Sequence, residues 1–512
     1  MPSSRFLVIV FFAATLCGAA FPSSPAVSVD GDRLVDPEGR TVYLRGMNVG
    51  SKSPKNRHLS WQTPEDFQRL RSWGMTAVRY MIFWSAVEPA PGEYDEEYLR
   101  GVDERIAWAR EAGLHVILDM HQDLYGPAIP GGNGMPAWAT LDDGLPHRTV
   151  GGVWSTAYFV SPKIHRAFDH FWQNAPGPDG VGIQDRFALA WRHVAARYRD
   201  EPAVIGFDML NEPFIGSDIR RVGWAVWMAL PDILRGADLP RNPLAFFESL
   251  KEDPYPSWLL ELAEDPVRYE RFLAAVTPAM QAFEREHLLP MYQRVRRAVR
   301  EVHPTGIFFL EPCVVANVGA VSALEPLTDD QGMRDPFQAY MPHFYDIVLD
   351  TPLAHAPSRA RLEIMMRNRA AEAHRMGMPL LVGEWGAFYG NDRCADAAAL
   401  MTGLLAANTC GEFYWEYHRG MEKTAYLPSL NRPSPLRVGG FPVAVRMAEP
   451  GGAMHVQWTE EKTPAPASEF HLPDGWVLEE EASGGKWGGA GTVSVPGAEK
   501  TGVREVTLRP AP

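Results

Sequence analysis

The sequence predicts an α/β protein: a (β/α)8 TIM barrel followed by a C-terminal all-β sandwich domain. Eight short apolar segments alternate with helical patterns over residues 28–428. Such alternation is typical of a parallel sheet, and the count of eight favours closure into a barrel. Polar residues fall at or near the C-terminal ends of these segments, where such barrels keep their active sites. Over residues 430–512 the pattern changes to short alternating runs separated by Gly, Pro and Asp, which indicates a sandwich.

The first half of the barrel follows a hairpin pattern at residues 28–40, in which Asp-Gly and Glu-Gly pairs mark the turns. The predicted strands are near-continuous apolar runs, as expected for strands that are buried on both faces. They span residues 43–50, 77–83, 114–120 and 204–210, with helices predicted at 64–73, 97–112 and 185–198.

The second half begins with a long segment, residues 214–276, that is rich in Trp, Leu, Phe and Pro. It exceeds an ordinary connection, and long insertions are commonly lids or binding loops. Further strands are predicted at 306–311, 339–345, 380–384 and 412–416, and helices at 278–302, 361–376 and 397–407. In the C-terminal domain, strands are predicted at 454–458, 470–472, 491–495 and 503–508.

Composition limits the classes of function. The chain has 512 residues and is 46% hydrophobic and 22% charged, which is ordinary globular material. Its formal net charge of -14 argues against nucleic-acid binding, because no basic excess is present to neutralise phosphates. The same charge weakens electrostatic docking to anionic membranes.

The N-terminus has the pattern of a signal peptide, residues 1–20. Arg5 precedes an apolar run from Phe6 to Leu16, and Gly18-Ala19-Ala20 offers small residues to a signal peptidase. Because no later segment offers about 18 uncharged apolar residues, we expect a soluble protein that is exported to the extracellular space or to the periplasm.

Two of the predicted strands end in a carboxylate. Asn211 and Glu212 follow the strand at 204–210, and Glu384 ends the strand at 380–384. A carboxylate at the mouth of an apolar strand is a candidate general acid/base, and paired carboxylates are what cleavage of a glycosidic bond requires. A separation of about 5–5.5 Å would mark a retaining enzyme, and about 6.5–9.5 Å an inverting one.

Other interpretations of these residues remain open at this point. Asn-Glu-Pro can simply end a strand, because proline cannot continue a ladder. Glu311 also closes a strand, but Pro312 follows it and no Asn precedes it. His121 and His343, taken alone, could be core histidines, and a zinc site would need a third ligand that the sequence does not place.

The order of these residues along the chain resembles glycoside hydrolase family five. The shared positions are Arg79, His121, Asn211-Glu212-Pro213, His343-x-Tyr345, Glu384 and Trp415. Within the family, the chain is similar to the endoglycoceramidase-like branch at residues 119–125 (DMHQDLY), 168–172 (FDHFW) and 431–435 (NRPSP). The resemblance covers about residue 28 to the end.

The resemblance implies a retaining double displacement, with Glu212 as acid/base and Glu384 as nucleophile. It implies that Asn211 binds the sugar 2-hydroxyl and that Arg79 and Tyr345 hold the Glu384 carboxylate. The full set of substrate-binding residues that it implies is Lys52, Arg79, His121, Asp123, Trp172, Asn211, His343, Tyr345 and Trp415. No metal and no organic cofactor are expected.

The expected activity is hydrolysis of the linkage between glycan and ceramide in glycosphingolipids. The alternatives are a β-glucosidase or β-glucosylceramidase, an endo-β-glucanase, or a non-catalytic glycolipid-binding protein. The segment 214–260 could form an apolar shelf for a lipid, or it could cover the barrel core. We expect a monomer that binds a glycolipid or oligosaccharide, makes transient contact with a membrane surface or micelle, and does not bind nucleic acid.

Overall fold

The predicted barrel is present in the computed structural model, which describes residues 26–151, 153–235, 263–447, 452–480 and 485–511. Eight parallel strands are ordered β10-β11-β4-β5-β6-β7-β8-β9, and the bridges Tyr340–Leu380 and Phe344–Trp385 join the two ends of the sheet. The strands are β4 (Leu44–Val49), β5 (Ala77–Ile82), β6 (His115–Met120), β7 (Val204–Asp208), β8 (Ile307–Leu310), β9 (Gln338–Tyr340), β10 (Leu381–Gly386) and β11 (Gly411–Trp415). All their residues are buried, as the apolar runs predict. The expected fold class is therefore confirmed.

The helices begin and end at capping residues that the sequence contains. Thr63 and Asp66 form a capping box at the start of α1, Asp95 caps α3, and Gly377 ends α12 with φ 58°. The main helices are α1 (Pro64–Ser72), α3 (Glu96–Glu111), α5 (Pro162–Trp172), α6 (Ile183–Arg197), α7 (Ile219–Ile233), α10 (Pro266–Phe283), α11 (Leu289–Arg300), α12 (Arg359–Met376) and α13 (Ala395–Asn408).

Shorter helical turns lie in the loops between these elements. They are η1 (Pro54–Asn56), α2 (Trp84–Val87), η2 (Ala137–Ala139), η3 (Trp154–Thr156), α4 (Ala157–Val160), η4 (Gly216–Asp218), η6 (Val314–Val318), η7 (Asp392–Cys394), η8 (Met421–Lys423) and α14 (Leu427–Leu430). A π-helical turn, η5 (Glu284–Leu288), joins α10 to α11.

Two predicted elements differ from the observed ones by more than two residues. The helix expected at 278–302 is part of a continuous helical run of α10, η5 and α11 that begins twelve residues earlier, at Pro266. The strand expected at 339–345 ends at Tyr340. Pro342 lies just beyond it and has no N–H to continue the ladder, which accounts for the early end.

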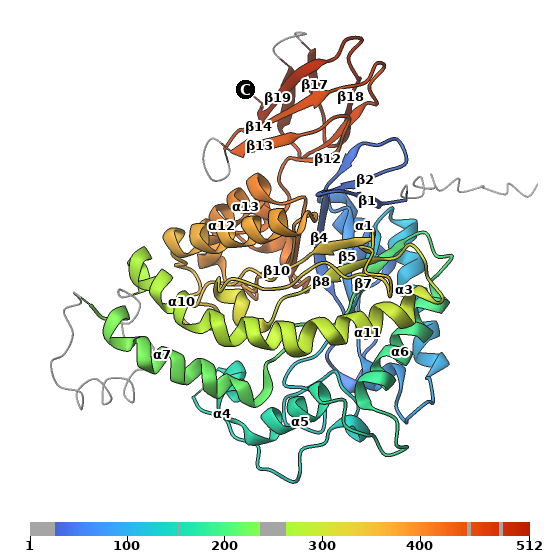
Figure 1. The fold of residues 1–512 in the computed structure, drawn as a ribbon. Helices are drawn as coiled ribbons and strands as arrows, with labels where there is room; N and C mark the ends of the chain where they lie inside the picture. Colours follow the sequence, from blue (N-terminus) through green and yellow to red (C-terminus); the bar gives the residue numbers. More distant parts are fainter. Residues whose placement is uncertain (1–25, 152, 236–262, 448–451, 481–484, 512) are drawn as a thin grey trace, which may run out of the picture.

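Two predicted segments lie wholly or partly outside the described residues: the signal peptide, residues 1–20, and the stretch 236–262 of the long insertion. The described remainder of the insertion forms η4, α7 and the start of α10. α7 packs against α10, and the pair extends to one side of the barrel (Figure 1). Within the described ranges, no helix is long and apolar enough to cross a bilayer.

The C-terminal region forms two antiparallel sheets with a shared core. One sheet is ordered β1-β2-β3-β12-β15-β18 and the other β13-β14-β19-β16-β17. Phe470 and Val495 of the first sheet pack with Val456, Trp458 and Leu508 of the second. The strands are β12 (Ser434–Val438), β13 (Val443–Met447), β14 (Met454–Glu460), β15 (Ser468–Leu472), β16 (Trp476–Glu480), β17 (Gly485–Gly488), β18 (Gly491–Val495) and β19 (Gly502–Pro510).

The hairpin near the start of the chain extends this sandwich. Its strands are β1 (Ser28–Asp30), β2 (Arg33–Val35) and β3 (Thr41–Val42). β3 pairs with β12, with Val42 opposite Arg437. The segment 28–428 that the sequence predicts as the barrel unit therefore includes three short strands that belong to a sheet of the sandwich, which they join through the β3–β12 pairing.

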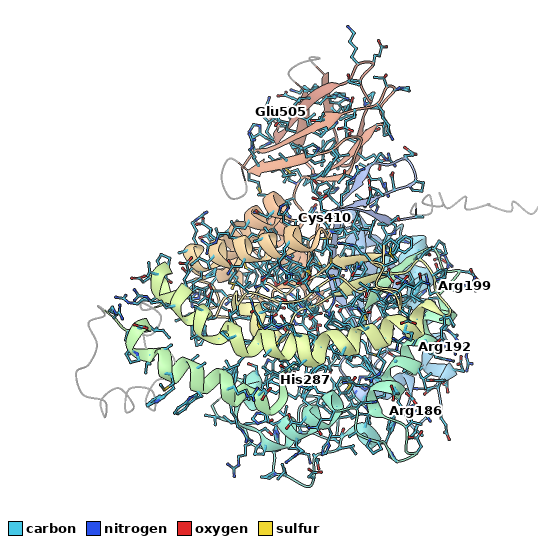
Figure 2. All side chains as sticks on the ribbon, in the orientation of Figure 1. Arg186, Arg192, Arg199, His287, Cys410 and Glu505 are labelled. Atoms are coloured by element: carbon cyan, nitrogen blue, oxygen red, sulfur yellow. The ribbon has the colours of Figure 1, made fainter. Side chains whose placement is uncertain are left out.

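The sandwich packs against the N-terminal ends of the barrel strands. The Tyr43 N–H donates to the Leu436 carbonyl (3.0 Å), and the Arg45 guanidinium donates to the Ser434 hydroxyl (2.8 Å). The His471 ring lies so close to Gly74 that a Cβ there would be 2.3 Å from it. Cys410 lies between the two parts (Figure 2). The C-terminal ends of the strands, on the opposite side, are left free for a site.

Candidate active site

Glu212 and Glu384 meet at the C-terminal rim of the barrel. Glu384 lies in β10, and Glu212 follows β7 by four residues. One carboxylate oxygen of each glutamate and one ring nitrogen of His343 all lie within 4.8 Å of one another. This spacing fits the separation of about 5–5.5 Å in retaining glycosidases better than the 6.5–9.5 Å of inverting ones.

The backbone at Glu212 is held in an uncommon conformation. Its φ is 45°, a value that non-glycine residues rarely adopt and that costs about 1 kcal/mol or more. The Glu212 N–H donates to Glu311 Oε2 (2.8 Å), and the Gln122 amide donates to the carbonyls of Asn211 (2.9 Å) and Glu212 (3.1 Å). These contacts maintain the turn that aims the Glu212 side chain into the site.

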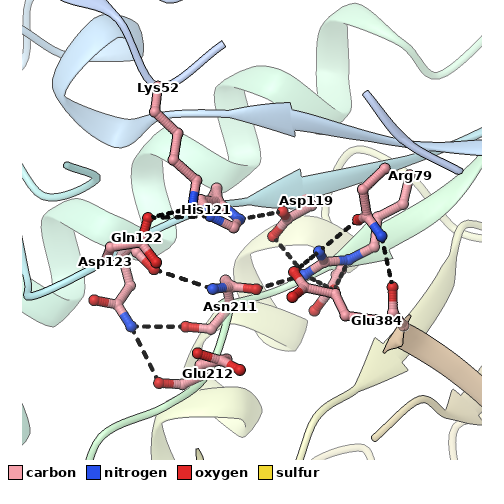
Figure 3. Close-up of polar contacts among 12 residues, drawn as sticks. Lys52, Arg79, Asp119, His121, Gln122, Asp123, Asn211, Glu212 and Glu384 are labelled. Carbon is pink, nitrogen blue, oxygen red and sulfur yellow. Dashed lines mark hydrogen bonds and ion pairs between the residues drawn. The ribbon is translucent and has the colours of Figure 1, made fainter. Parts of the chain in front are cut away.

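Arg79 is the electrostatic centre of the rim. Its buried guanidinium pairs with Glu384 (2.7 Å) and with three other carboxylates, those of Asp119 (3.0 Å), Asp208 (2.7 Å) and Glu311 (2.8 Å), as Figure 3 shows in part. Burial disfavours the charged form, but these carboxylates outweigh it and raise the pKa of Arg79 well above its ordinary value. Arg79 is therefore a permanent cation that orients Glu384.

Glu384 is held from both sides. Arg79 Nη1 lies 2.7 Å from its Oε1, and the Tyr345 hydroxyl donates to its Oε2 (2.9 Å). Burial raises the pKa of Glu384, while His343 and Arg79 act to lower it. A carboxylate that is desolvated, oriented and matched by cations has the properties of a nucleophile.

His343 bridges the two glutamates. Its Nδ1 lies 3.0 Å from Glu212 Oε1 and 3.5 Å from Glu384 Oε2, and its Nε2 lies 3.0 Å from Glu311 Oε1. Burial opposes protonation, but Glu311 and Glu384 raise the pKa of His343 well above its ordinary value. His343 is therefore a cation that faces both glutamates.

A second polar group lies beside the carboxylates. The His121 ring stacks on Trp415 with 5.2 Å between centroids, and Lys52 Nζ lies 4.3 Å from the Trp415 ring and 2.6 Å from Asp123 Oδ2. Burial works against the charge on His121, but Asp119 and its hydrogen bond raise the pKa of His121 to about 9. Burial likewise disfavours ionised Asp123, but Lys52 and His121 hold the pKa of Asp123 well below its usual range.

Both groups open into one cavity of about 710 Å³. Its polar part is lined by Lys52, His121, Asp123, Asn211, Glu212, Tyr345, Glu384 and Trp415. Its apolar part is lined by side chains of α4, α7, α10 and η6, among them Phe159, Val222, Val226, Phe272, Val276 and Val315. A sugar and an aliphatic chain could therefore bind in the same cavity, side by side.

The family model for Cellulase (glycosyl hydrolase family 5) matches residues 35–420. This chain belongs to glycosyl hydrolase family 5. As a family-5 member it is a glycoside hydrolase, and its two rim carboxylates are the pair that such hydrolysis needs. The resemblance recognised in the sequence is confirmed.

Within family 5, this chain is similar to proteins named for activity on glycosylated ceramides. Endoglycoceramidase I of Rhodococcus hoagii (strain 103S) is 25% identical over 497 residues, which cover 93% of this chain and 86% of that protein. The solved structure of endo-glycoceramidase II from Rhodococcus sp. in its ganglioside GM3 complex is 27% identical, with a TM-score of 0.68, covering 94% of this chain and 100% of that one. A glucosylceramidase of Aspergillus fumigatus is 30% identical over 244 residues, 36% of this chain and 32% of that protein.

Trp172 is the one implied site residue that the structure places away from the others. Its indole N–H donates to the Phe214 carbonyl (2.8 Å), and its ring packs edge-on against Phe283 at 4.9 Å. It is 7% exposed and belongs to the barrel core. Phe214 does line the cavity, so Trp172 supports the wall from behind.

Several residues that the sequence did not single out belong to the site of this family-5 enzyme. Asp119 and Asp208 neutralise Arg79 from within β6 and β7. A charged residue inside an apolar strand needs a buried partner. The positions of Asp119 and Asp208 in the sequence could therefore have indicated that they belong to a buried ion pair. Asn317 contacts Glu212 (2.6 Å) from η6, and the Trp154 indole donates to Asp350 (3.1 Å) across two loops. No periodic pattern marks such loop residues.

Proposed function

We propose that this enzyme hydrolyses the β-glycosidic linkage between the glycan and the ceramide of glycosphingolipids, with retention of configuration. The observation that carries the proposal is the single cavity, in which a polar carboxylate site adjoins an apolar compartment. A glycolipid has the same two parts, a sugar and a lipid, joined at the bond to be cut. The activities named for the two Rhodococcus relatives support the proposal.

In the first step, the Glu384 carboxylate attacks the anomeric carbon while Glu212 transfers its proton to the leaving oxygen. The bond to that oxygen breaks, the ceramide leaves with its hydroxyl restored, and the glycan is bound to Glu384 as an ester. In the second step, Glu212, now a carboxylate, takes a proton from a water molecule whose oxygen attacks the anomeric carbon. The ester bond to Glu384 breaks, and the sugar leaves with its original configuration.

The groups that hold the Glu384 carboxylate serve both steps. The charge on Glu384 is lost when the ester forms and returns when it breaks. Arg79, Tyr345 and protonated His343 are already oriented toward this carboxylate, so little reorganisation is needed when its charge changes.

In the polar compartment, the Trp415 ring would form a floor for the sugar. Its face is flat and is already part of a stack with His121. Asp123, Lys52 and Asn211 would bind sugar hydroxyls, because they present carboxylate, ammonium and amide groups to the cavity.

Product analysis tests the proposed activity. The protein is incubated separately with a ganglioside, lactosylceramide and glucosylceramide, with Glu384→Gln as the control. We expect intact oligosaccharide and free ceramide from the first two substrates, and no product from the variant. Release of glucose alone would favour the glucosylceramidase activity that is named for the A. fumigatus relative. Cleavage of cello-oligosaccharides with no cleavage of any glycolipid would overturn the proposal.

We also propose that α7 makes transient contact with a membrane surface or micelle. Trp224, Trp227 and Met228 on α7 are 65%, 54% and 62% exposed, and Val222 and Val226 of the same helix line the apolar compartment. Tryptophan favours the interface between water and lipid. Insertion of this face would bring lipid next to the compartment. The net charge of -14 makes apolar insertion the main source of attraction.

Sedimentation with phosphatidylcholine vesicles tests this contact. Trp224→Ser combined with Trp227→Ser should lower the bound fraction several-fold. The control is Met333→Ser, at a residue 66% exposed elsewhere on the surface, and it should bind as the wild type does. Equal binding by the double variant and the wild type would contradict the proposal.

We further propose that the protein is exported and is a monomer. The apolar run from Phe6 to Leu16 supports export through a signal peptide. N-terminal sequencing of secreted protein should place the first residue shortly after Ala20, and light scattering should give the mass of one chain. An uncleaved N-terminus or a dimer mass would contradict the respective proposal.

A further inference from the structure

The loop after β8 carries a residue that contacts the acid/base directly. Asn317, in η6, donates from Nδ2 to Glu212 Oε1 at 2.6 Å. The neighbouring Val314, Val315 and Val318 line the apolar compartment of the cavity. One short segment therefore touches both the proton donor and the space proposed for the lipid.

The two oxygens of Glu212 are in different situations. Oε1 accepts from Asn317 and from protonated His343 (3.0 Å). In the described part of the chain, no hydrogen bond to Oε2 is found, and the side chain is 13% exposed toward the cavity. An oxygen that faces two N–H donors is a poor place for a further proton. The proton of the acid form therefore belongs on Oε2, the oxygen that is free to face the leaving group.

The η6 segment is anchored from outside the site. The Val314 N–H donates to the Pro213 carbonyl (3.0 Å), which ties the segment to the residue after Glu212. Glu284, buried in the π turn η5, accepts from the Cys313 N–H (3.1 Å) and from the Ser322 hydroxyl (3.0 Å). Both ends of the segment are thus held by one carboxylate, and Asn317 is presented to Glu212 from a rigid support.

We propose that Asn317 is a positioning residue for proton transfer. It holds Glu212 by Oε1, so that Oε2 delivers the proton to the leaving oxygen and later receives the proton of water. This inference rests on the acid/base role proposed for Glu212. It does not depend on the lipid nature of the substrate.

Two aryl lactosides separate this role from a structural one. Phenyl β-lactoside needs a proton on its leaving oxygen, whereas 2,4-dinitrophenyl β-lactoside does not. For Asn317→Ala, we expect kcat/KM on the phenyl substrate to fall about 10- to 100-fold, as for a misplaced catalytic group. On the dinitrophenyl substrate, kcat/KM should stay within about 3-fold, while kcat and KM fall together because slow base catalysis lets the ester accumulate.

Asn368→Ala is the matched control. Asn368 donates to the Gly319 carbonyl (2.9 Å) and so supports the same segment without touching Glu212. Asn368→Ala should change kcat/KM on the two lactosides by the same small factor. If Asn317→Ala lowers kcat/KM equally on both lactosides, or if Asn368→Ala shows the same selectivity, Asn317 is only structural and the proposal is overturned.

Asn317→Asp provides a second readout and preserves the size of the side chain. Ionised aspartate cannot donate to Glu212 and repels it, whereas protonated aspartate can donate again. The ratio of variant to wild-type activity on phenyl β-lactoside should therefore rise as the pH is lowered, while the ratio for Asn317→Ala stays flat. A flat ratio for both variants would overturn the proposal. Failure of the wild type to cleave glycolipids would refute only the proposed substrate.

Discussion

At the scale of single residues, the two glutamates have different surroundings and so different expected roles. Glu384 is 4% exposed and is fixed by a cation and a phenol. Glu212 is fixed through one oxygen only and presents the other to the cavity. The first arrangement suits a nucleophile, which must stay oriented, and the second suits a proton carrier.

Replacement of either glutamate by glutamine should distinguish these roles. Glu384→Gln should abolish turnover of phenyl and dinitrophenyl β-lactoside alike, because no ester can form. For Glu212→Gln, kcat/KM on phenyl β-lactoside should fall about 100- to 10,000-fold. The same variant should still release a burst of dinitrophenol from dinitrophenyl β-lactoside. Steady-state and burst kinetics measure both effects. A burst from Glu384→Gln, or none from Glu212→Gln, would reverse or remove the assigned roles.

Arg79 should matter for stability as well as for activity. Arg79→Met leaves Asp119, Asp208, Glu311 and Glu384 without their shared cation. Breaking a buried pair in this way typically costs about 3–5 kcal/mol. The free energy of unfolding in urea should fall by about that amount. Arg297→Met is the control, because Arg297 pairs with Asp330 on the surface (64% and 72% exposed side chains) and should change stability by less than about 1 kcal/mol. Similar losses from both variants would contradict this account of Arg79.

At the scale of elements, α7 and α10 together form an arm that borders the apolar part of the cavity. Its inner face supplies Val222 and Val226 from α7, and Phe272 and Val276 from α10, to the apolar compartment. The long insertion seen in the sequence left two interpretations open, a lipid shelf or a cover for the core. The described part covers the core and also lines the cavity, because Ile219 and Val222 belong to the barrel core and to the cavity wall; its use as a lipid shelf belongs to the proposed function.

A charge placed on the inner face of the arm should disable lipid binding selectively. Val226→Glu would put a carboxylate into the apolar compartment, where burying it without a partner is costly. We expect kcat/KM on lactosylceramide to fall at least about 10-fold, with little change on dinitrophenyl β-lactoside. Val267→Glu on α10 is the control, because Val267 is 53% exposed and lies outside the cavity lining. Equal activity of Val226→Glu and Val267→Glu on lactosylceramide would argue against a lipid-binding compartment.

At the scale of the whole molecule, the sandwich and the active site occupy opposite ends of the barrel. The contact between barrel and sandwich buries two histidines that sit near arginines. Burial and the charges of Arg437 and Arg71 lower the pKa of His115 to about 3, and burial with Arg45 and Arg71 lowers the pKa of His471 to about 3. Both imidazoles are therefore neutral in the folded protein at neutral pH.

These histidines predict acid sensitivity. Between about pH 3 and the ordinary histidine pKa near 6.5, the unfolded chain binds protons that the folded protein does not, so stability falls as the pH drops through this window. The loss is about 1 kcal/mol per histidine for each pH unit. Urea unfolding at pH 7 and pH 4.5 should show a smaller loss for His115→Gln and His471→Gln than for the wild type. An equal loss in all three proteins would contradict the prediction.

The barrel, the sandwich and the two rim carboxylates were predictable from the amino-acid sequence. Apolar periodicity reports which segments are buried, and parallel strands bring their C-terminal ends to one rim. Glu212 and Glu384 therefore had to face the same side once the strands were placed. Asp119, Asp208 and Arg79 are charged residues inside apolar strands, so burial requires a partner for each, but the sequence does not say which partner.

The contacts between side chains could not be predicted in this way. Burial patterns do not name partners, so β3 pairs with β12 rather than with the barrel, and Trp172 supports a wall instead of lining the cavity. Asn317 reaches Glu212 because Glu284 anchors its loop, 33 residues away in sequence. Contacts between loops depend on how whole elements pack, and they produce no periodic pattern in the sequence from which they could be predicted.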